Sequence, residues 1–546
     1  MAEQDTTQGI PEPEGAAALI DTDYEIGQDN VEGSLGPFGF DIHNPVFMIS
    51  GLTIVAFVFY ALALPQQAAD LFGWLRPFLT STFDWFFLGA ANIFVLFCLA
   101  LIVLPVGGVR LGGQDATPDY SYVGWFAMLF AAGMGIGLMF FGVLEPVYHM
   151  AISQPLGVPS PIADDGSIIA ENVEAAKRMG LAATIYHWGL HPWAIYAVVA
   201  LALALFSFNK GLPLTIRSAF YPVFGERVWG WTGHIIDTLA VFATLFGLAT
   251  SLGFGAQQAN AGLEHVFGIA NNTSVQVLLI SGITGIALIS VLRGLDGGVK
   301  VLSEINMGIA ALLLLFVLLA GPTLTILADF VEGLGAYGKE LVALSNPIGR
   351  EDTGYMQGWT AFYWAWWISW SPFVGMFIAR VSRGRTVREF VICVLIIPSL
   401  VCVLWMAVFG GVAIDQVLSD PAGSAVKAQV IDSYNPPISL FAMLEGLPLA
   451  KITSVIGIVL VIVFFVTSSD SGSLVIDTIT AGGKIDAPVP QRVFWATFEG
   501  AVAIVLLLGG GLPALQAAVI STGLPFTLVL LLMCYAIFRG LQSEKR

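Results

Sequence analysis

The chain has 546 residues, of which 56% are apolar and 11% charged, and its mean hydropathy is +0.81. Soluble domains carry about 25% charged residues, so this composition excludes a soluble globular protein and indicates an all-α polytopic membrane protein. The net charge is −17, and no nucleic-acid partner is expected. The four cysteines lie in apolar runs without metal-like spacing, so packing is their expected role.

The two ends of the chain differ in composition from the rest. Residues 1–43 hold ten acidic residues and no lysine or arginine, together with many glycines, glutamines and prolines. A segment of this kind cannot bury enough apolar surface to fold, so we expect an acidic, disordered, cytoplasmic tail. Residues 539–546 are expected to form a short basic C-terminal tail.

Twelve apolar runs of about 18 residues or more predict twelve transmembrane helices. Their approximate limits are 44–64, 83–105, 119–149, 181–208, 231–257, 274–293, 306–327, 356–380, 388–413, 451–470, 490–510 and 513–538. With both termini cytoplasmic, the inner loops hold 15 of the 22 basic residues, as the positive-inside rule requires. Residues 328–346 are amphipathic and predict a helix on the outer surface.

Two of these spans are interrupted in a related way. Span three contains several glycines and span eight a proline, and the two lie five spans apart. This is the layout of two inverted five-helix repeats, each opened by a broken helix. The repeats would occupy 119–327 and 356–538, and residues 44–118 would supply two peripheral helices.

The glycines of span three lie in AAGMGIGLMFFG, at positions 133, 135 and 137. They could serve close helix packing, or they could unwind the helix, since a spacing of two gives no single packing face. Unwound backbone in a membrane must line a cavity or be buried in protein; its N–H groups suit a carboxylate and its carbonyls suit Na⁺. Glu145, followed by Pro146, ends the span on the outer side, where a structural role and a proton relay are both open.

Two spans carry clusters of aromatic residues. Span four contains Trp188, Trp193 and Tyr196 near one helix face, either as core residues or as part of a site. Residues 359–370 hold five tryptophans. These form either an aromatic belt at the lipid headgroups or a cage for a ligand cation, because indole faces attract ammonium groups.

Hydroxyl side chains concentrate in two other spans. Span ten ends in FFVTSSDSGS, residues 464–473, and span five carries Thr244, Thr250 and Ser251. Such side chains either bond their own helix backbone or offer oxygens to a hard cation. Asp470 is expected near the cytoplasmic end of span ten, partly solvated.

AAGMGIGLMFFG, HWGLHPWAIY, FYWAWWISWSPFVGMFIARVSRGRTVREF and FFVTSSDSG together resemble the betaine/carnitine/choline transporter family. The resemblance covers spans three to twelve. It implies two inverted five-helix repeats of the LeuT type, a homotrimer in contact with membrane lipid, and a location in the bacterial inner membrane. The family's long basic C-terminal helix is missing here, so strong osmotic gating is not expected.

The resemblance also implies a substrate site. The family's aromatic box matches Trp188, Trp193, Tyr196 and Trp367, which would cage an onium group. Trp366 and Trp370 match aromatics on the substrate path, and Phe362 matches a gating position. The substrate carboxylate would meet the backbone of Gly133, Met134 and Gly135 and the hydroxyl of Ser251.

One sodium site of the family matches well: the carbonyls of Ala131, Met134 and Phe464 and the hydroxyls of Thr467 and Ser468. A second site keeps Thr244, but Leu248 replaces its other threonine. Proton-coupled choline carriers have an aspartate where this chain has Gly137, and sodium-independent carnitine exchangers have an arginine in span five, where residues 236–256 hold no basic residue. Both absences favour Na⁺ symport.

The expected function is therefore Na⁺-coupled import of a zwitterionic onium compound. Glycine betaine leads, with dimethylsulfoniopropionate, choline, carnitine and ectoine as other candidates. A Na⁺-independent exchanger of the same family is the nearest alternative. A channel would need a ring of charges or a filter-like repeat, and an enzyme could start only from the His187/His191 pair.

Overall fold

The computed structural model describes residues 11–36, 38–293, 299–350 and 352–544. Within them the chain is helical apart from its N-terminal part and its loops. The first helices are α1 Asn44–Ala63, α2 Pro65–Val103, α3 Tyr122–Gly133, α4 Ile136–Ala151, α5 Ala170–Trp188, α6 Leu190–Ala204, α7 Tyr221–Phe224, α8 Trp231–Phe267, α9 Thr273–Arg293 and α10 Val299–Ala320. The others are α11 Thr323–Ser345, α12 Thr353–Tyr355, α13 Ala361–Arg380, α14 Val387–Ser419, α15 Ser439–Glu445, α16 Ala450–Thr480, α17 Val489–Leu508 and α18 Leu512–Gln542.

All twelve predicted runs are helical. Among the described residues, ten helices are long and apolar enough to cross a membrane, or eleven if the bent pair α3 and α4 is one span. Helix α13 falls outside this group because its tryptophans, tyrosine, serines and proline lower its hydropathy, although most of it is buried. The chain is thus a polytopic all-α membrane protein, and the number twelve and the inverted repeats remain predictions.

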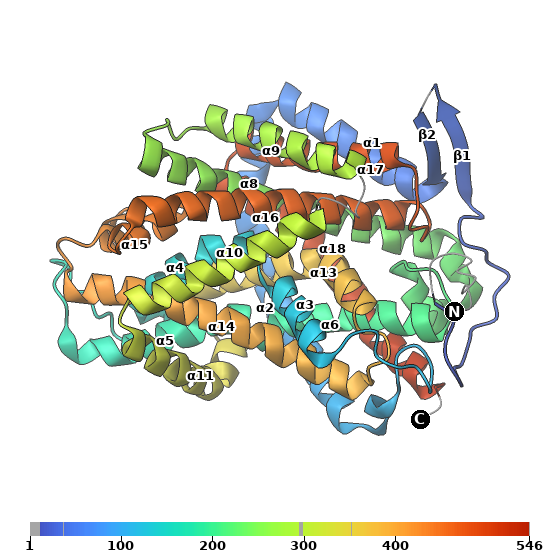
Figure 1. Cartoon of the computed structure of the whole chain (residues 1–546), viewed down its shortest axis with the longest axis horizontal. Coiled ribbons are helices and arrows are strands. Elements are labelled where there is room, and N and C mark those ends of the chain that lie inside the picture. Colours follow the sequence, from blue (N-terminus) through green and yellow to red (C-terminus); the bar gives the residue numbers. More distant parts are fainter. Residues whose placement is uncertain (1–10, 37, 294–298, 351, 545–546) are drawn as a thin grey trace.

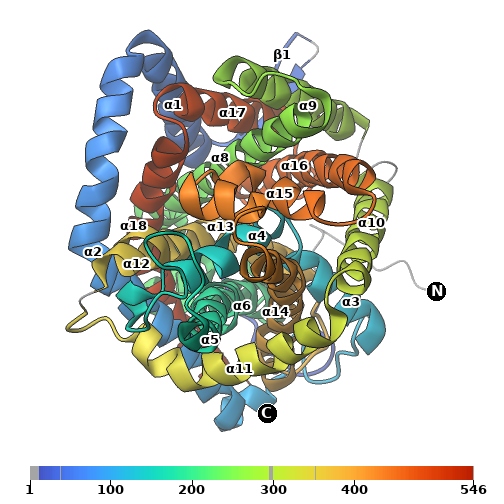
Figure 2. The same cartoon turned by 90° about the vertical axis from the view of Figure 1, so that its left-hand side faces the viewer.

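Several long helices, α8, α14 and α16 among them, run roughly along one axis of the molecule (Figure 1), whereas α2 runs across it (Figure 2). The hairpin of strands β1 (Asn30–Leu35) and β2 (Phe38–His43) lies at one end of this axis, and α11 lies toward the opposite end (Figure 1). Seen along the axis, α4, α6 and α13 occupy the centre, while α2 and α11 lie at the edge (Figure 2). Helix α13 packs against α6, α8 and α18, so the tryptophan-rich segment is the middle of the bundle.

The N-terminal segment is not a disordered tail where the structure describes it. Strands β1 (Asn30–Leu35) and β2 (Phe38–His43) form an antiparallel hairpin, and Tyr24 stacks on Trp229 with ring centroids 4.2 Å apart. Lys484 Nζ lies 2.5 Å from Asp41 Oδ2. Burial lowers the pKa of Lys484, but its bonds with Asp41 and Glu32 outweigh this and raise it. Residues 1–10 of the predicted tail lie outside the described residues.

The C-terminal tail also differs from the prediction. Helix α18 continues to Gln542, so Arg539 lies in its last turn. Beyond the helix, Glu544 is buried and its Oε1 lies 2.5 Å from Lys210 Nζ. Residues 545–546 lie outside the described residues. The charged ends of the chain are therefore docked by ion pairs with partners hundreds of residues away, which local composition does not reveal.

Candidate functional site

The helix of span three breaks where the glycine spacing indicates. Helix α3 ends at Gly133, α4 begins at Ile136, and the two axes differ by 66°. Met134 and Gly135 between them have extended backbone, with φ −93° and −178°. The start of α4 is held by side chains of other helices: Trp405 Nε1 donates to Leu138 O at 3.0 Å, and Gln258 Nε2 donates to Met139 O at 2.7 Å. The unwinding interpretation is confirmed.

Gly137 serves a different purpose from the two glycines before it. It lies inside α4, and a Cβ at this position would stand 2.9 Å from Trp188 Cη2 and 3.0 Å from Trp366 Cη2. Heavy atoms of that kind do not approach so closely without a shift. The missing side chain at Gly137 therefore lets the two indole rings approach the broken helix.

A cavity opens beside the break. Ten of the eleven residues expected to contact substrate line it: Gly133, Met134, Gly135, Trp188, Trp193, Tyr196, Ser251, Trp366, Trp367 and Trp370. The remaining lining is mainly apolar, as is typical of sites for small ligands. Residues of four separate predicted spans thus converge on one pocket.

Four of these side chains stand around the cavity as a set of aromatic faces. The ring centroids of Trp188 and Trp367 are 4.9 Å apart at 76°, and those of Trp193 and Tyr196 are 5.3 Å apart at 74°. Tyr196 and Trp367 complete the set at 6.1 Å. Trp367 is only 8% exposed, so the belt interpretation is wrong for this segment. We call Trp188, Trp193, Tyr196 and Trp367 the aromatic cage.

Phe362 is the expected contact residue that does not line this cavity. It lines a second one, together with Arg76, Trp359 and Tyr434. Its ring stacks on Trp366, with centroids 5.5 Å apart and planes at 17°. Because Trp366 lines the first cavity and Phe362 the second, this stacked pair separates the two.

Ser251 is partly committed to other contacts. Its hydroxyl donates to Gly247 O at 3.2 Å and accepts from Trp366 Nε1 at 3.1 Å. Gly247 O also accepts from Trp370 Nε1 at 2.9 Å. A single turn of α8 therefore fixes the orientation of two tryptophans along the cavity.

Helices α4 and α16, which border the residues expected to bind Na⁺, approach each other across α8. Ile136 Cδ1 and Phe465 Cδ2 lie 3.2 and 3.6 Å from the position of a Cβ on Gly255, so the start of α4 and this part of α16 meet on the same face of α8. Thr467 Oγ1 donates to Val463 O at 3.0 Å, which leaves its lone pairs free. Thr467 and Ser468 are both partly accessible. Their hydroxyls, with the carbonyls at the break, are the hard oxygen donors that suit Na⁺.

The second sodium site that the resemblance implies would include Thr244 on α8. Thr244 Oγ1 donates to Ala240 O at 2.7 Å. One turn later, the side chain of Leu248 packs directly against Gly472 of α16. An apolar side chain thus fills the position where the family's second threonine would offer an oxygen.

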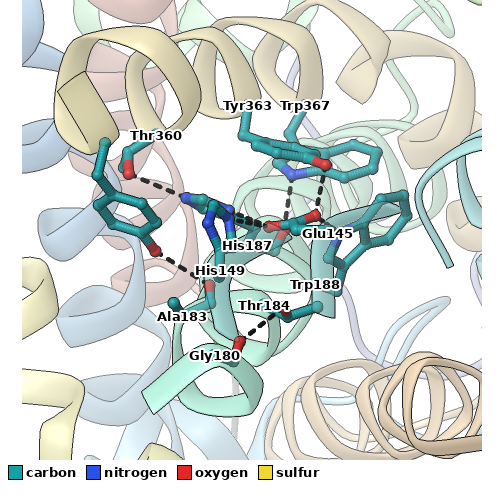
Figure 3. A network of polar contacts seen from close by, with 11 residues as sticks. Glu145, His149, Gly180, Ala183, Thr184, His187, Trp188, Thr360, Tyr363 and Trp367 are labelled. Atoms are coloured by element: carbon teal, nitrogen blue, oxygen red, sulfur yellow. Dashed lines mark hydrogen bonds and ion pairs between the residues drawn. The ribbon is translucent and has the colours of Figure 1, made fainter. Parts of the chain in front are cut away.

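A buried polar network behind the cage was missed by the sequence interpretation (Figure 3). Glu145 does not end a span at the membrane surface: it lies inside α4, fully buried, with Pro146 also inside the helix. Its carboxylate contacts His187 Nδ1 and lies 3.3 Å from His149 Nε2. An acidic residue in an otherwise apolar span, with histidines nearby in the sequence, was the available signal.

The histidines of span four have separate partners. His187 Nε2 contacts Thr360 Oγ1 at 2.9 Å, while His191 Nε2 contacts Asn92 Oδ1 at 2.9 Å. Gly189 interrupts the helix between them, where α5 ends and α6 begins. The i and i+4 metal pair is therefore not formed, and hydrogen bonding between helices is the observed role.

Asp470 is the other acid that the structure relocates. It is 1% exposed, and α16 continues beyond it to Thr480. The expectation of a partly solvated residue near the end of the span is wrong. The apolar run ends at Val466, but the helix does not, because hydroxyl and small residues continue it.

Comparison with known proteins agrees with this geometry. Residues 45–546 match the betaine/carnitine/choline family transporter profile. The chain is 61% identical to a glycine betaine/proline/choline transporter of Vibrio parahaemolyticus, covering 99% of this chain and 98% of that protein. It is 52% identical to a glycine betaine/proline/choline/ectoine transporter of the same organism, over 96% and 91% of the two chains. It is 42% identical to the glycine betaine transporter OpuD of Bacillus subtilis, over 92% and 95%. The chain therefore belongs to the betaine/carnitine/choline transporter family and is a transporter, not an enzyme.

Proposed function

We propose that the protein imports a zwitterionic onium compound together with Na⁺, and that glycine betaine is its main substrate. The observation that carries this proposal is the aromatic cage beside the broken helix. Dimethylsulfoniopropionate, choline, carnitine and ectoine are the other candidates. The names of the relatives support the onium class, since each includes glycine betaine.

The two ends of such a substrate match the two sides of the cavity. The indole and phenol faces of Trp188, Trp193, Tyr196 and Trp367 attract a quaternary ammonium group, and a dry site strengthens this attraction to about 2 kcal/mol. The carboxylate lies toward the extended backbone at Met134 and Gly135, where helical N–H groups are freed. A cage of this kind selects charge and size, so sulfonium and ammonium groups both fit.

Na⁺ binds between the break and α16 in this proposal. Carbonyls of Ala131, Met134 and Phe464 and hydroxyls of Thr467 and Ser468 supply five oxygens, the type of ligand that hard cations bind. Because the ion joins the broken helix to a neighbouring helix, it favours the arrangement that binds substrate. Coupling between two ligands is ordinarily about 1–3 kcal/mol. Leu248 offers no oxygen at the second sodium site of the family, so we propose a single Na⁺ site.

The two helical repeats rock around this site, and the protein lies in the inner membrane as a homotrimer in contact with lipid. Both chain ends are cytoplasmic, so the end of the molecule that carries the β1–β2 hairpin (Figure 1) faces inward, with the basic residues of the loops on that side. Helix α11 then lies on the outer surface. The Phe362–Trp366 stack closes the path on that side.

Titration of tryptophan fluorescence tests this proposal. The purified protein is titrated with the candidate onium compounds, first in Na⁺ and then in K⁺ of equal ionic strength. We expect saturable quenching by glycine betaine that tightens at least five-fold in Na⁺. Equal affinity in the two salts would contradict Na⁺ coupling, and no response to any onium compound would contradict the substrate class.

A further inference from the structure

Glu145 connects the broken helix to two walls of the substrate cavity. Its Oε2 accepts from Trp188 Nε1 at 2.7 Å and from Tyr363 OH at 2.5 Å. Its Oε1 contacts His187 Nδ1. Figure 3 shows these side chains converging on one carboxylate from α4, α5 and α13. A buried carboxylate needs such partners, and this one has them on both oxygens.

Two partners of Glu145, Trp188 and His187, also determine the position of a cage residue. Trp188 is itself a cage wall, and its indole N–H can only donate, so an acceptor behind it determines how the ring stands. His187 carries the backbone carbonyl that accepts from Trp367 Nε1 at 2.9 Å. Tyr363 lies between them: its ring centroid is 4.4 Å from His187 and 5.9 Å from Trp367.

A metal ion is the competing explanation for this cluster. One donor atom each from Glu145, His149 and His187 lies within 4.8 Å of the other two. However, both Oε2 contacts are hydrogen bonds from groups that do not bind metals in neutral form, and His187 already contacts Oε1. The hydrogen-bonded network accounts for four of the five side chains without an ion, and His149 is the additional contact.

We propose that Glu145 is a positioning residue for substrate recognition: its carboxylate orients Trp188 directly and Trp367 through His187, so that both indole faces point at the onium group. The inference rests on the proposed function. It adds that hydrogen bonds to Glu145, a residue that does not line the substrate cavity, determine the orientation of the cage residues.

Three variants show whether the acceptor oxygens of the Glu145 side chain, and not its volume, determine the positions of the cage residues. Glu145→Leu keeps the volume and removes both acceptors. Glu145→Gln keeps one carbonyl oxygen for Trp188 and Tyr363, and its amide can donate to His187 Nδ1 if that ring adopts its other tautomer. His149→Asn is the matched control, because His149 approaches the same carboxylate at 3.3 Å but bonds no cage residue. All three are first checked for a monodisperse, cooperatively unfolding protein.

The first measurement is the glycine betaine Kd in saturating Na⁺. We expect an increase of at least ten-fold in Glu145→Leu, less than three-fold in Glu145→Gln, and none in His149→Asn. Thermal protection by Na⁺ alone should be unchanged in all three. If Glu145→Leu does not fold, Tyr363→Phe replaces it: this change removes one donor to Oε2, keeps the ring, and should raise Kd at least three-fold.

The second measurement is independent of substrate. In protein labelled with 5-fluorotryptophan, the ¹⁹F resonance of Trp188, assigned through Trp188→Phe, should move in Glu145→Leu and stay in place in Glu145→Gln. Wild-type affinity in Glu145→Leu, or an equal loss in Glu145→Gln and Glu145→Leu, would overturn the inference. So would binding that a chelator abolishes and Zn²⁺ restores. A wild-type protein that binds no onium compound would instead refute the proposed function, and the ¹⁹F result would still decide the positioning role.

Discussion

Replacing Trp367 by leucine should show how much of the substrate affinity comes from the charge of the onium group and how much from its shape. Trp367 is 8% exposed and stands 4.9 Å from Trp188 and 6.1 Å from Tyr196, so it forms one wall of a nearly dry cage. A desolvated cation–π contact contributes about 2 kcal/mol, which corresponds to a loss in affinity of about 30-fold. Leucine retains an apolar surface but no π face, so the expected loss comes mainly from the missing quadrupole.

The assay compares two ligands of the same shape. Glycine betaine and 3,3-dimethylbutanoate differ only in a nitrogen cation replaced by a neutral carbon. Isothermal titration should show that Trp367→Leu weakens glycine betaine about 30-fold and changes the neutral analogue by less than three-fold. Trp364→Leu is the control, because Trp364 stacks on His191 away from the cavity. Equal losses for both ligands would refute the cation–π reasoning, since shape alone would then explain them.

The sodium site and the close approach of the indoles give three further predictions. Thr467→Ala should raise the half-saturating Na⁺ concentration for uptake about ten-fold, and an unchanged Na⁺ dependence would remove this hydroxyl from the site. Leu248→Thr places an oxygen where an apolar side chain meets α16, so the Hill slope for Na⁺ should rise above one; an unaltered slope would locate any second ion elsewhere. Gly137→Ala should weaken glycine betaine several-fold, because its methyl group displaces Trp188 and Trp366; crystallography or ¹⁹F spectra showing unmoved rings would contradict that explanation.

The central features of the site were predictable because they depend on local sequence. Three glycines at a spacing of two cannot form a packing stripe, and the helix indeed breaks at Met134 and Gly135. Five tryptophans in twelve residues exceed what a membrane interface needs, and four of the five line one or other of the two cavities or stand beside them, while Trp364 packs elsewhere. Apolar runs located the long helices other than α11, which an amphipathic pattern predicted, since both patterns are properties of a single segment.

Features that depend on distant partners were not predictable in the same way. The hairpin of β1 and β2 forms from an acidic segment because Lys484 lies more than 440 residues further along the chain at the same surface. The interruption at Gly189 gave no signal, since one glycine inside an apolar run is common in membrane helices. The sequence pattern predicts a helix end at Glu145 because Pro146 follows it, yet both residues lie inside α4. The ring of Pro146 packs against Gly410 of α14, where a side chain would collide with it.

Uptake by reconstituted proteoliposomes tests the central claim most directly. Vesicles without internal substrate are given labelled glycine betaine outside, under an inward Na⁺ gradient and, separately, under an equal K⁺ gradient. Na⁺-coupled symport predicts that the Na⁺ gradient drives accumulation above the external concentration, and that dissipating it with a sodium ionophore releases the excess. Transport that ignores Na⁺, or that begins only when the vesicles are preloaded with substrate, would contradict the account.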